Sequence, residues 1–284
     1  MDPLTQTVVV SIELMSRWMK QKRYSASTMS TYLSFVRQFF AATGVQPDNI
    51  NKETIVQYNY RQFIRGGKSY ATQNQWINAI KLYLKVNNLA IGDLEEIERP
   101  RKERKLPNVL SQDEVLAIFH NTPNLKHRAL LMLIYGAGLR IGEALNLTIH
   151  DIRSEESLIY IRGGKGKKDR RVPLSLKLLE VLRSYYKAYR PKSYLFEGAN
   201  GGRYSSKSAS QVLKRSASRA GIARKITLHT LRHSYATHLT NKGVNIQYLQ
   251  EILGHNSPKT TMLYTHLSGR DISNIRSPLD DMDL

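Results

Sequence analysis

The stretch "ERPRKERKLPNVLS", from Glu98 to Ser111, decides the architecture because it separates two parts of the chain. It has almost no apolar residue to bury, and Pro100 and Pro107 oppose a regular helix across it. Its basic residues are Arg99, Arg101, Lys102, Arg104 and Lys105. We therefore predict an interdomain linker at residues 93–108, between domains at 1–92 and 109–284. Arg101 and Arg104 could also lie along a phosphate backbone.

The composition indicates a polyanionic partner. The chain has 284 residues, with 43 Lys and Arg against 23 Asp and Glu, a formal charge of +20. Nucleic acid is the first candidate partner, and a membrane surface or simple solubility are the alternatives. The absence of cysteine excludes disulfides, thiolate nucleophiles and cysteine-based zinc sites. Without a long apolar run or a basic leader, we expect a cytoplasmic, nucleoid-associated protein.

The N-terminal part has the pattern of a helical domain. Ser25 or Ser27 can cap a helix that Gly44 would end. One face of that helix carries Met29, Tyr32, Leu33, Val36, Phe39 and Phe40. A shorter helix is expected around Thr54–Ile64, and a further one around Trp76–Leu84. These apolar stripes are most simply core.

The C-terminal part reads as mainly α-helical with one small sheet. Ser111–Glu114 forms a capping box, and Arg128–Arg140 contains a buried helix that stops at glycines. "SLIYIRG" (157–163) and "RRVPLS" (170–175) predict two strands, with "GKGKKD" (164–169) as their turn.

The stretch "YGAGLRIGEALNL" (Tyr135–Leu147) places Arg140 at the start of a helix, three residues before Glu143. An arginine beside helix N-terminal amides can hold an oxyanion, and the glutamate could orient it. On this stretch alone, a surface Arg–Glu pair is the simpler interpretation.

The turn between the two strands is strongly basic. It contains Lys165, Lys167 and Lys168, and the strand that follows begins with Arg170 and Arg171. Like charges at this density favour a bound polyanion, and the neighbouring glycines permit close approach of the backbone. The Walker pattern is absent, so ATP binding is not supported. Lys165, between two glycines, could act as a flexible proton donor.

In "ITLHTLRHSYATHL" (Ile226–Leu239), His229 and His233 have a spacing that can bind zinc. A zinc protease would need glutamate where Thr230 stands, and Arg232 beside the pair would repel a dication. His229 and Arg232 instead offer two donors to one anion. His233 and His238 are more simply structural, and no metal site is predicted.

The stretch "LGHNSPKTTMLYTH" (Leu253–His266) adds His255, a helix start at Ser257, and Tyr264 about two turns later. Cationic groups and a tyrosine together suggest phosphoryl transfer, with arginines binding the nonbridging oxygens. A phenol of pKa about 10 is ionised to only about one part in a thousand at pH 7. Surrounding cations would favour the phenolate, and Lys or His can protonate the leaving oxygen.

With these motifs in place, the whole chain resembles the tyrosine recombinases, also called the phage-integrase family. Its size and two-part layout are most similar to the Xer-type branch. The motifs that carry the resemblance are Arg140 in G-L-R-I-G-E, Lys165 in G-K-G, His229 and Arg232 in H-T-L-R-H, His255 in L-G-H, and Tyr264 in Y-T-H. No catalytic position of the family is missing.

The resemblance implies an N-terminal helical DNA-binding domain and a C-terminal α+β catalytic domain that clamp duplex DNA. Tyr264 would form a 3′-phosphotyrosine and release a 5′-hydroxyl, with no metal, ATP or other cofactor. The implied roles are phosphate binding by Arg140, Arg232 and His255, general acid catalysis by Lys165, proton movement by His229, and support by Glu143. DNA contacts are expected from Lys167, Lys168, Arg170, Arg171, Arg101 and Arg104.

The resemblance further implies a homotetramer bound to two DNA sites, which would assemble from free monomers or dimers. Whether an accessory protein takes part is left open. The reaction would resolve chromosome dimers or move a mobile element. A topoisomerase IB-like nicking enzyme and an inactive DNA-binding regulator are the alternatives. Relatives dock a C-terminal helix into a neighbouring protomer, and Ile272 and Ile275 could serve that contact, although a frayed terminus is equally compatible. Tyr235 is the rival nucleophile.

Overall fold

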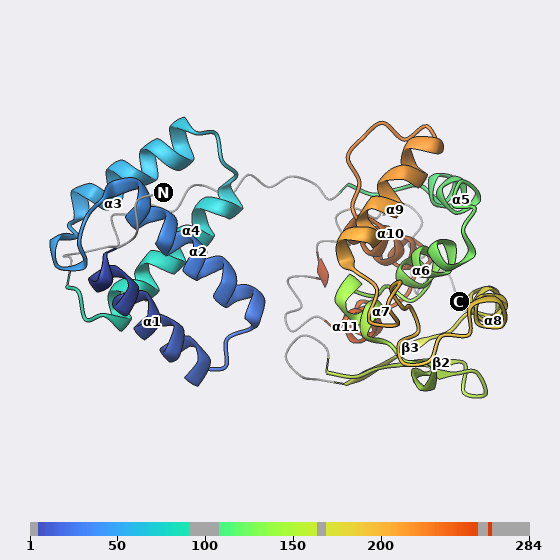
Figure 1. Cartoon of the computed structure of the whole chain (residues 1–284). Coiled ribbons are helices and arrows are strands. Elements are labelled where there is room, and N and C mark those ends of the chain that lie inside the picture. Colours follow the sequence, from blue (N-terminus) through green and yellow to red (C-terminus); the bar gives the residue numbers. More distant parts are fainter. Residues whose placement is uncertain (1–4, 91–107, 164–168, 255–260, 263–284) are drawn as a thin grey trace, which may run out of the picture. The chain divides into compact units, whose positions relative to one another are not determined.

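The computed structural model describes residues 5–90, 108–163, 169–254 and 261–262. The chain forms two compact units, 1–104 and 105–284, each described here by itself (Figure 1). The division falls within the segment predicted as a linker, of which only residue 108 belongs to the described residues. In the described part of the chain, no helix has the length and apolarity needed to cross a membrane.

The described part of the N-terminal unit is helical. Its elements are α1 (Gln6–Gln21), α2 (Ala26–Thr43), the 3-10 turn η1 (Pro47–Asn49), α3 (Lys52–Asn59), the π-helical turn η2 (Tyr60–Arg65) and α4 (Tyr70–Val86). Ser25 caps α2, since its hydroxyl accepts a hydrogen bond from the Thr28 amide, and Gly44 ends it at φ +66°. The single helix expected around residues 54–64 is α3 followed by η2.

The N-terminal core surrounds Trp76, which is fully buried. Its ring stacks on Tyr58 at a centroid distance of 5.3 Å and lies 5.1 Å from Phe63. Aromatic contacts of this kind add about 1 kcal/mol each beyond the area they bury. Helix α1, which the sequence predictions did not delimit, closes this core with buried Val8 and Ile12.

The C-terminal unit is mainly α-helical with a small sheet, as predicted. Its helices are α5 (Gln112–His120), α6 (Leu125–Gly136), α7 (Ile141–Asn146), α8 (Leu176–Tyr189), α9 (Ser206–Arg219), α10 (Leu228–Asn241) and α11 (Ile246–Leu253). After the 3-10 turn η4 (Ile149–Asp151), three antiparallel strands follow in the order β1 (Ile152–Arg153), β2 (Leu158–Ile161) and β3 (Arg170–Pro173). Strand β1 is the one that the sequence did not indicate.

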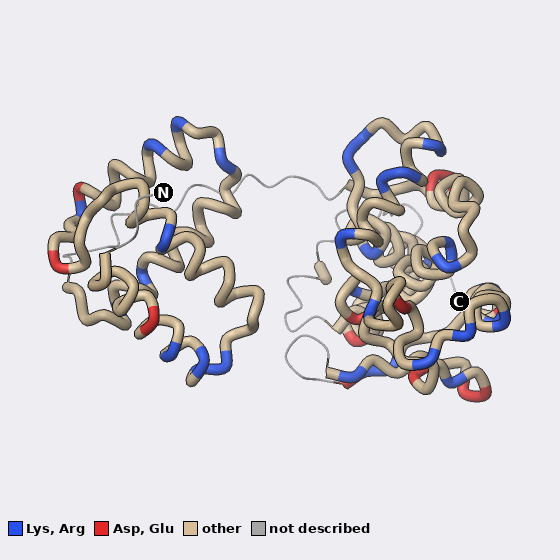
Figure 2. The backbone as a smooth tube through the Cα atoms, in the orientation of Figure 1, with Lys and Arg blue, Asp and Glu red and all other residues tan. Residues whose placement is uncertain are grey.

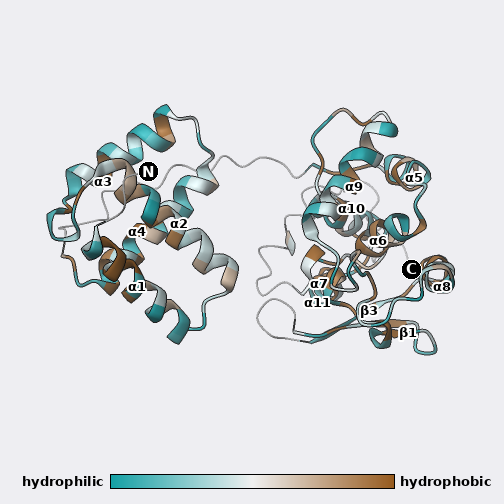
Figure 3. Cartoon of the chain, in the orientation of Figure 1, coloured by the Kyte–Doolittle hydropathy of each residue, from teal (hydrophilic) through white to brown (hydrophobic). Residues whose placement is uncertain are grey.

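Local signals in the sequence position the elements of this unit. Ser111 and Glu114 form the predicted capping box at the start of α5. Helix α6 is hydrophobic along much of its length (Figure 3) and packs against α8 and α10. The register pairs Ile161 with Arg170, so Arg170 is the first residue of β3 beyond the basic turn.

Candidate active site

The Glu143 carboxylate is the centre of a cluster of guanidinium groups. It accepts hydrogen bonds from the Arg140 amide and Nη1, both at 2.8 Å. Arg170 donates Nη1 and Nη2 to the two carboxylate oxygens at 2.9 and 2.8 Å. Arg232 Nη1 lies 3.7 Å from Glu143 Oε2. The cluster therefore joins residues of α7, β3 and α10.

Electrostatics keep Glu143 ionised although its side chain is only 8% exposed. Burial by itself would raise the pKa of its carboxyl. The hydrogen bonds from Arg170 and from the Arg140 amide, with the Arg170 charge, outweigh burial and lower the pKa to about 2. Glu143 is therefore a fixed anion at neutral pH.

The same arginines bind the last backbone carbonyls of α11 and its C-cap. The bonds are Arg170 Nε to Ile252 O at 2.8 Å, Arg232 Nη2 to Leu253 O at 2.6 Å, and Arg140 Nη2 to Gly254 O at 3.0 Å. Carbonyls at a helix C-terminus lack intrahelical donors and carry a partial negative charge. The end of α11 thus helps to compensate the positive cluster.

The cluster has an inner and an outer face. The side chains of Arg232 and Arg170 are 1% and 9% exposed, whereas that of Arg140 is 27% exposed. Arg232 Nη1 also donates to Gly138 O at 2.7 Å, which fixes it against the turn after α6. Arg140 is therefore the most exposed guanidinium of the cluster, with net positive charge behind it.

His229 lies in the first turn of α10 with an exposed side chain. Desolvation by surrounding atoms, then the charges of Arg232 and Arg140, lower the pKa of His229. The centroid of its ring lies 4.1 Å from that of the His233 ring. Burial, followed by the charges of His229 and Arg232, lowers the pKa of His233 to about 4. Both imidazoles are therefore mostly neutral at pH 7.

The other polar groups of this region have structural contacts. His238 Nδ1 hydrogen-bonds to the Tyr135 hydroxyl at 2.8 Å. Tyr235, the rival nucleophile, is buried against Tyr135, and burial raises its pKa to about 12. Within the described residues, no group of three or more His, Cys, Asp or Glu side chains could hold a metal ion.

The structure brings Arg140, Glu143 and Arg232 together, with His229 nearby. The spacing of the motifs in the sequence could not have shown this proximity. Arg171 is exposed on β3. The basic turn predicts a DNA contact for Arg170, but the structure directs its guanidinium to Glu143 and Ile252 instead. Strand alternation explains this, because Arg170 shares a face with buried Val172. Outside the described residues lie Lys165, Lys167, Lys168, His255, Tyr264, Arg101 and Arg104.

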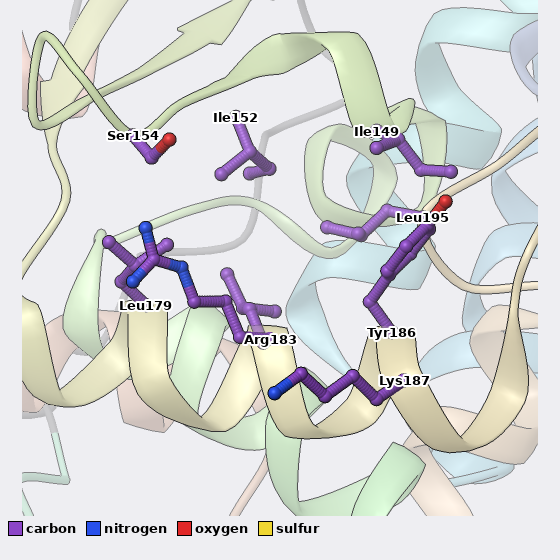
Figure 4. A pocket seen from close by; sticks show the side chains of 9 residues that line it. Ile149, Ile152, Ser154, Leu179, Arg183, Tyr186, Lys187 and Leu195 are labelled. Carbon is purple, nitrogen blue, oxygen red and sulfur yellow. The ribbon is translucent and has the colours of Figure 1, made fainter.

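A separate cavity of about 370 Å³ opens between η4, β1 and α8 (Figure 4). Its walls include Ile149, Ile152 and Leu182, with Arg183 and Lys187 from α8. None of the residues of the Glu143 cluster lines this cavity.

The chain combines a helical N-terminal unit with a mainly helical C-terminal unit that carries a buried arginine–glutamate cluster, and comparisons with known proteins identify the class. Residues 108–270 match the phage integrase family, and residues 12–88 match the N-terminal SAM-like domain of phage integrases. The chain belongs to the phage integrase family and is a Xer-type tyrosine recombinase, a site-specific DNA recombinase.

Individual relatives agree with this assignment. The chain is 35% identical over 274 residues to a tyrosine recombinase of Thermosipho africanus, covering 92% of this chain and 96% of the relative. It is 33% identical over 265 residues to the tyrosine recombinase XerA of Pyrococcus horikoshii, covering 92% and 90%. The structure of XerH site-specific recombinase bound to difH substrate, a pre-cleavage complex, matches with a TM-score of 0.71 and 25% identity, covering 90% of this chain and 80% of that one.

Proposed function

We propose that this recombinase cleaves and rejoins duplex DNA at a specific site through a 3′-phosphotyrosine on Tyr264. The observation that carries the proposal is the convergence of Arg140 and Arg232 on one carboxylate, with Arg140 partly exposed. The exposed part of Arg140 can bind a nonbridging oxygen of a phosphodiester as charge develops on it, whereas Arg232 would first have to give up its bond to Gly138 O or Leu253 O.

The chemistry balances without a cofactor. The Tyr264 hydroxyl gives its proton to neutral His229, its oxygen attacks phosphorus, the bond to the 5′ oxygen breaks, and Lys165 supplies the proton that this oxygen takes. The neutral His229 exchanges protons with the site, His255 binds a phosphate oxygen, and Glu143 supports the arginines. The reverse attack by a 5′-hydroxyl of a partner strand reseals the DNA.

Charge supports a DNA partner. Lys and Arg outnumber Asp and Glu by 43 to 23 in the sequence, and basic positions are spread over both units in Figure 2. We assign phosphate-backbone contacts to Arg171, Lys167, Lys168, Arg101 and Arg104. By similarity to relatives that act on DNA sites, we propose a homotetramer on two sites, acting in the nucleoid.

We propose chromosome dimer resolution as the biological role, because the chain spans most of the length of its Xer-named relatives. Sequencing the DNA that remains covalently bound to the protein in cells tests this role. One chromosomal site common to sister chromosomes supports it, whereas sites at the ends of a mobile element would replace it with integration or excision.

The reaction is tested with a nicked suicide duplex that carries the mapped site. We expect a covalent protein–DNA adduct with the wild-type chain, in chelator and without ATP, and none with Tyr264→Phe. Tyr235→Phe is the matched control and should retain the adduct. An adduct that survives Tyr264→Phe would refute the choice of nucleophile. Supercoil relaxation without site preference would favour the topoisomerase-like alternative, and site binding without any adduct would favour the regulator.

A further inference from the structure

Each of the three guanidinium nitrogens of Arg170 donates a hydrogen bond inside the protein. Its Nη1 and Nη2 bind both oxygens of Glu143, and its Nε binds Ile252 O. A paired-oxygen contact of this geometry is stronger and more directional than a single ion pair. With its side chain 9% exposed, Arg170 cannot reach DNA while it keeps these bonds.

The backbone around Arg170 is shaped to accommodate it. Gly254 ends α11 at φ +60°, and a Cβ added there would lie 3.1 Å from Arg170 Cδ and 3.2 Å from Nε. Glycine is favoured both for this conformation and for this close approach. The Arg170 side chain therefore ties β3 to α7 and to the end of α11.

Loss of Arg170 would act on the other arginines through Glu143. Among the residues that the structure describes, the charged groups bound to this carboxylate are Arg140 at the start of α7, Arg170 on β3 and Arg232 on α10, and the described end of α11 contributes carbonyls to the cluster. Without Arg170, the buried carboxylate loses its two-point contact. The carboxylate keeps only its bonds from the Arg140 amide and Nη1, so it is held less firmly, and burial raises its pKa.

We propose that Arg170 is a positioning residue, which holds Glu143 and thereby sets the Arg140 guanidinium that binds the scissile phosphate. This inference rests on the proposed function and deepens it. A role limited to stability would lower the amount of folded protein without changing the pH dependence of cleavage by the molecules that are folded.

The test compares Arg170→Met, Arg170→Lys and wild type. Single-turnover cleavage of the suicide duplex is measured from pH 5 to pH 8, with the DNA dissociation constant and circular dichroism of each variant. Arg224→Met is the matched control, because Arg224 also makes a two-point pair, with Glu114, outside the cluster. The carboxyl pKa of Glu143 is measured by NMR in wild type and both Arg170 variants.

We expect Arg170→Met to cleave roughly 100-fold more slowly, with DNA affinity within about threefold of wild type, because a misplaced clamp slows chemistry more than binding. Its cleavage rate should fall further as the pH is lowered, tracking the raised pKa of Glu143. Arg170→Lys should recover roughly a tenth of the wild-type rate, since an ammonium cannot span both oxygens. Arg224→Met should cleave as wild type.

The proposal is overturned if Arg170→Met keeps the wild-type rate, or if its loss of rate is the same at every pH and equals its loss of DNA binding. If Arg170→Met does not fold, Arg170→Lys decides by the same criteria. If wild type forms no adduct, the proposed function fails. The NMR comparison still decides whether Arg170 positions Glu143, and an unchanged Glu143 pKa in the folded variant refutes that role.

Discussion

Replacing Glu143 by glutamine should reduce the loss of unfolding free energy that acidification causes. The pKa of Glu143 is lowered from 4.5 to about 2, a change that corresponds to about 3 kcal/mol at 1.36 kcal/mol per unit. Because the folded pKa is the lower one, this stabilisation is complete above the unfolded pKa of about 4.5. It is lost as the pH falls toward 2. Wild type should therefore lose about 3 kcal/mol from this group between about pH 5 and pH 2.

The assay is urea unfolding followed by far-UV circular dichroism at a series of pH values. Both tryptophans, Trp18 and Trp76, lie in the N-terminal unit, so parallel fluorescence identifies the transition of that unit. In Glu143→Gln, the C-terminal unit should unfold at a lower urea concentration than in wild type at pH 7. Its urea midpoint should then fall less as the pH is lowered. Glu114→Gln is the control, because Glu114 has one arginine partner and a more exposed side chain. Equal acid sensitivity of wild type and Glu143→Gln would refute the assignment of the cluster.

Three further substitutions test the packing and caps that position the site. Gly138→Ala should destabilise the C-terminal unit by at least about 2 kcal/mol, since Gly138 has φ +61° and the new Cβ would lie 2.5 Å from Tyr235 Cδ1; unchanged thermal unfolding would contradict this. Ser111→Ala should cost about 1 kcal/mol through loss of the capping box, measured as a lower urea midpoint. Tyr83→Phe should cost about 1 kcal/mol, read by tryptophan fluorescence, because the Ser11 hydroxyl loses its buried donor.

The elements that the sequence predicted well are those with local signals. The cap at Ser25, the αL glycine at Gly44 and the capping box at Ser111 all lie where the pattern places them. Helix α1 shows a similar signal, with Val8, Ile12, Met15 and Met19 buried on one face, and this spacing could have delimited it. Strand β1 is only two residues long, too short for a period-2 pattern to stand out.

The site was predictable only in part, because its contacts are not local. Arg140 and Glu143 are three residues apart, and by themselves they favoured a surface ion pair. Burial of the pair depends on Arg170 and Arg232, which arrive from β3 and α10. The alternation of buried and exposed residues in β3 could have predicted that the Arg170 side chain is buried. No spacing in the sequence, however, links Arg170 to Glu143. The carbonyls at the end of α11 have no side-chain signature at all.

The guanidiniums act on the pKa of two different groups in this site, in addition to the desolvation that is the largest cause of the lowered pKa of His229. The guanidiniums lower the pKa of Glu143, which keeps its charge, and they help to lower the pKa of His229, which loses its charge. At neutral pH the cluster is therefore an ionised carboxylate, cationic donors and a neutral imidazole. A histidine held neutral beside fixed cations can take up a proton when a bound oxyanion offsets their charge. In the proposed reaction, the arrangement that would bind the phosphate would also prepare the proton acceptor beside it.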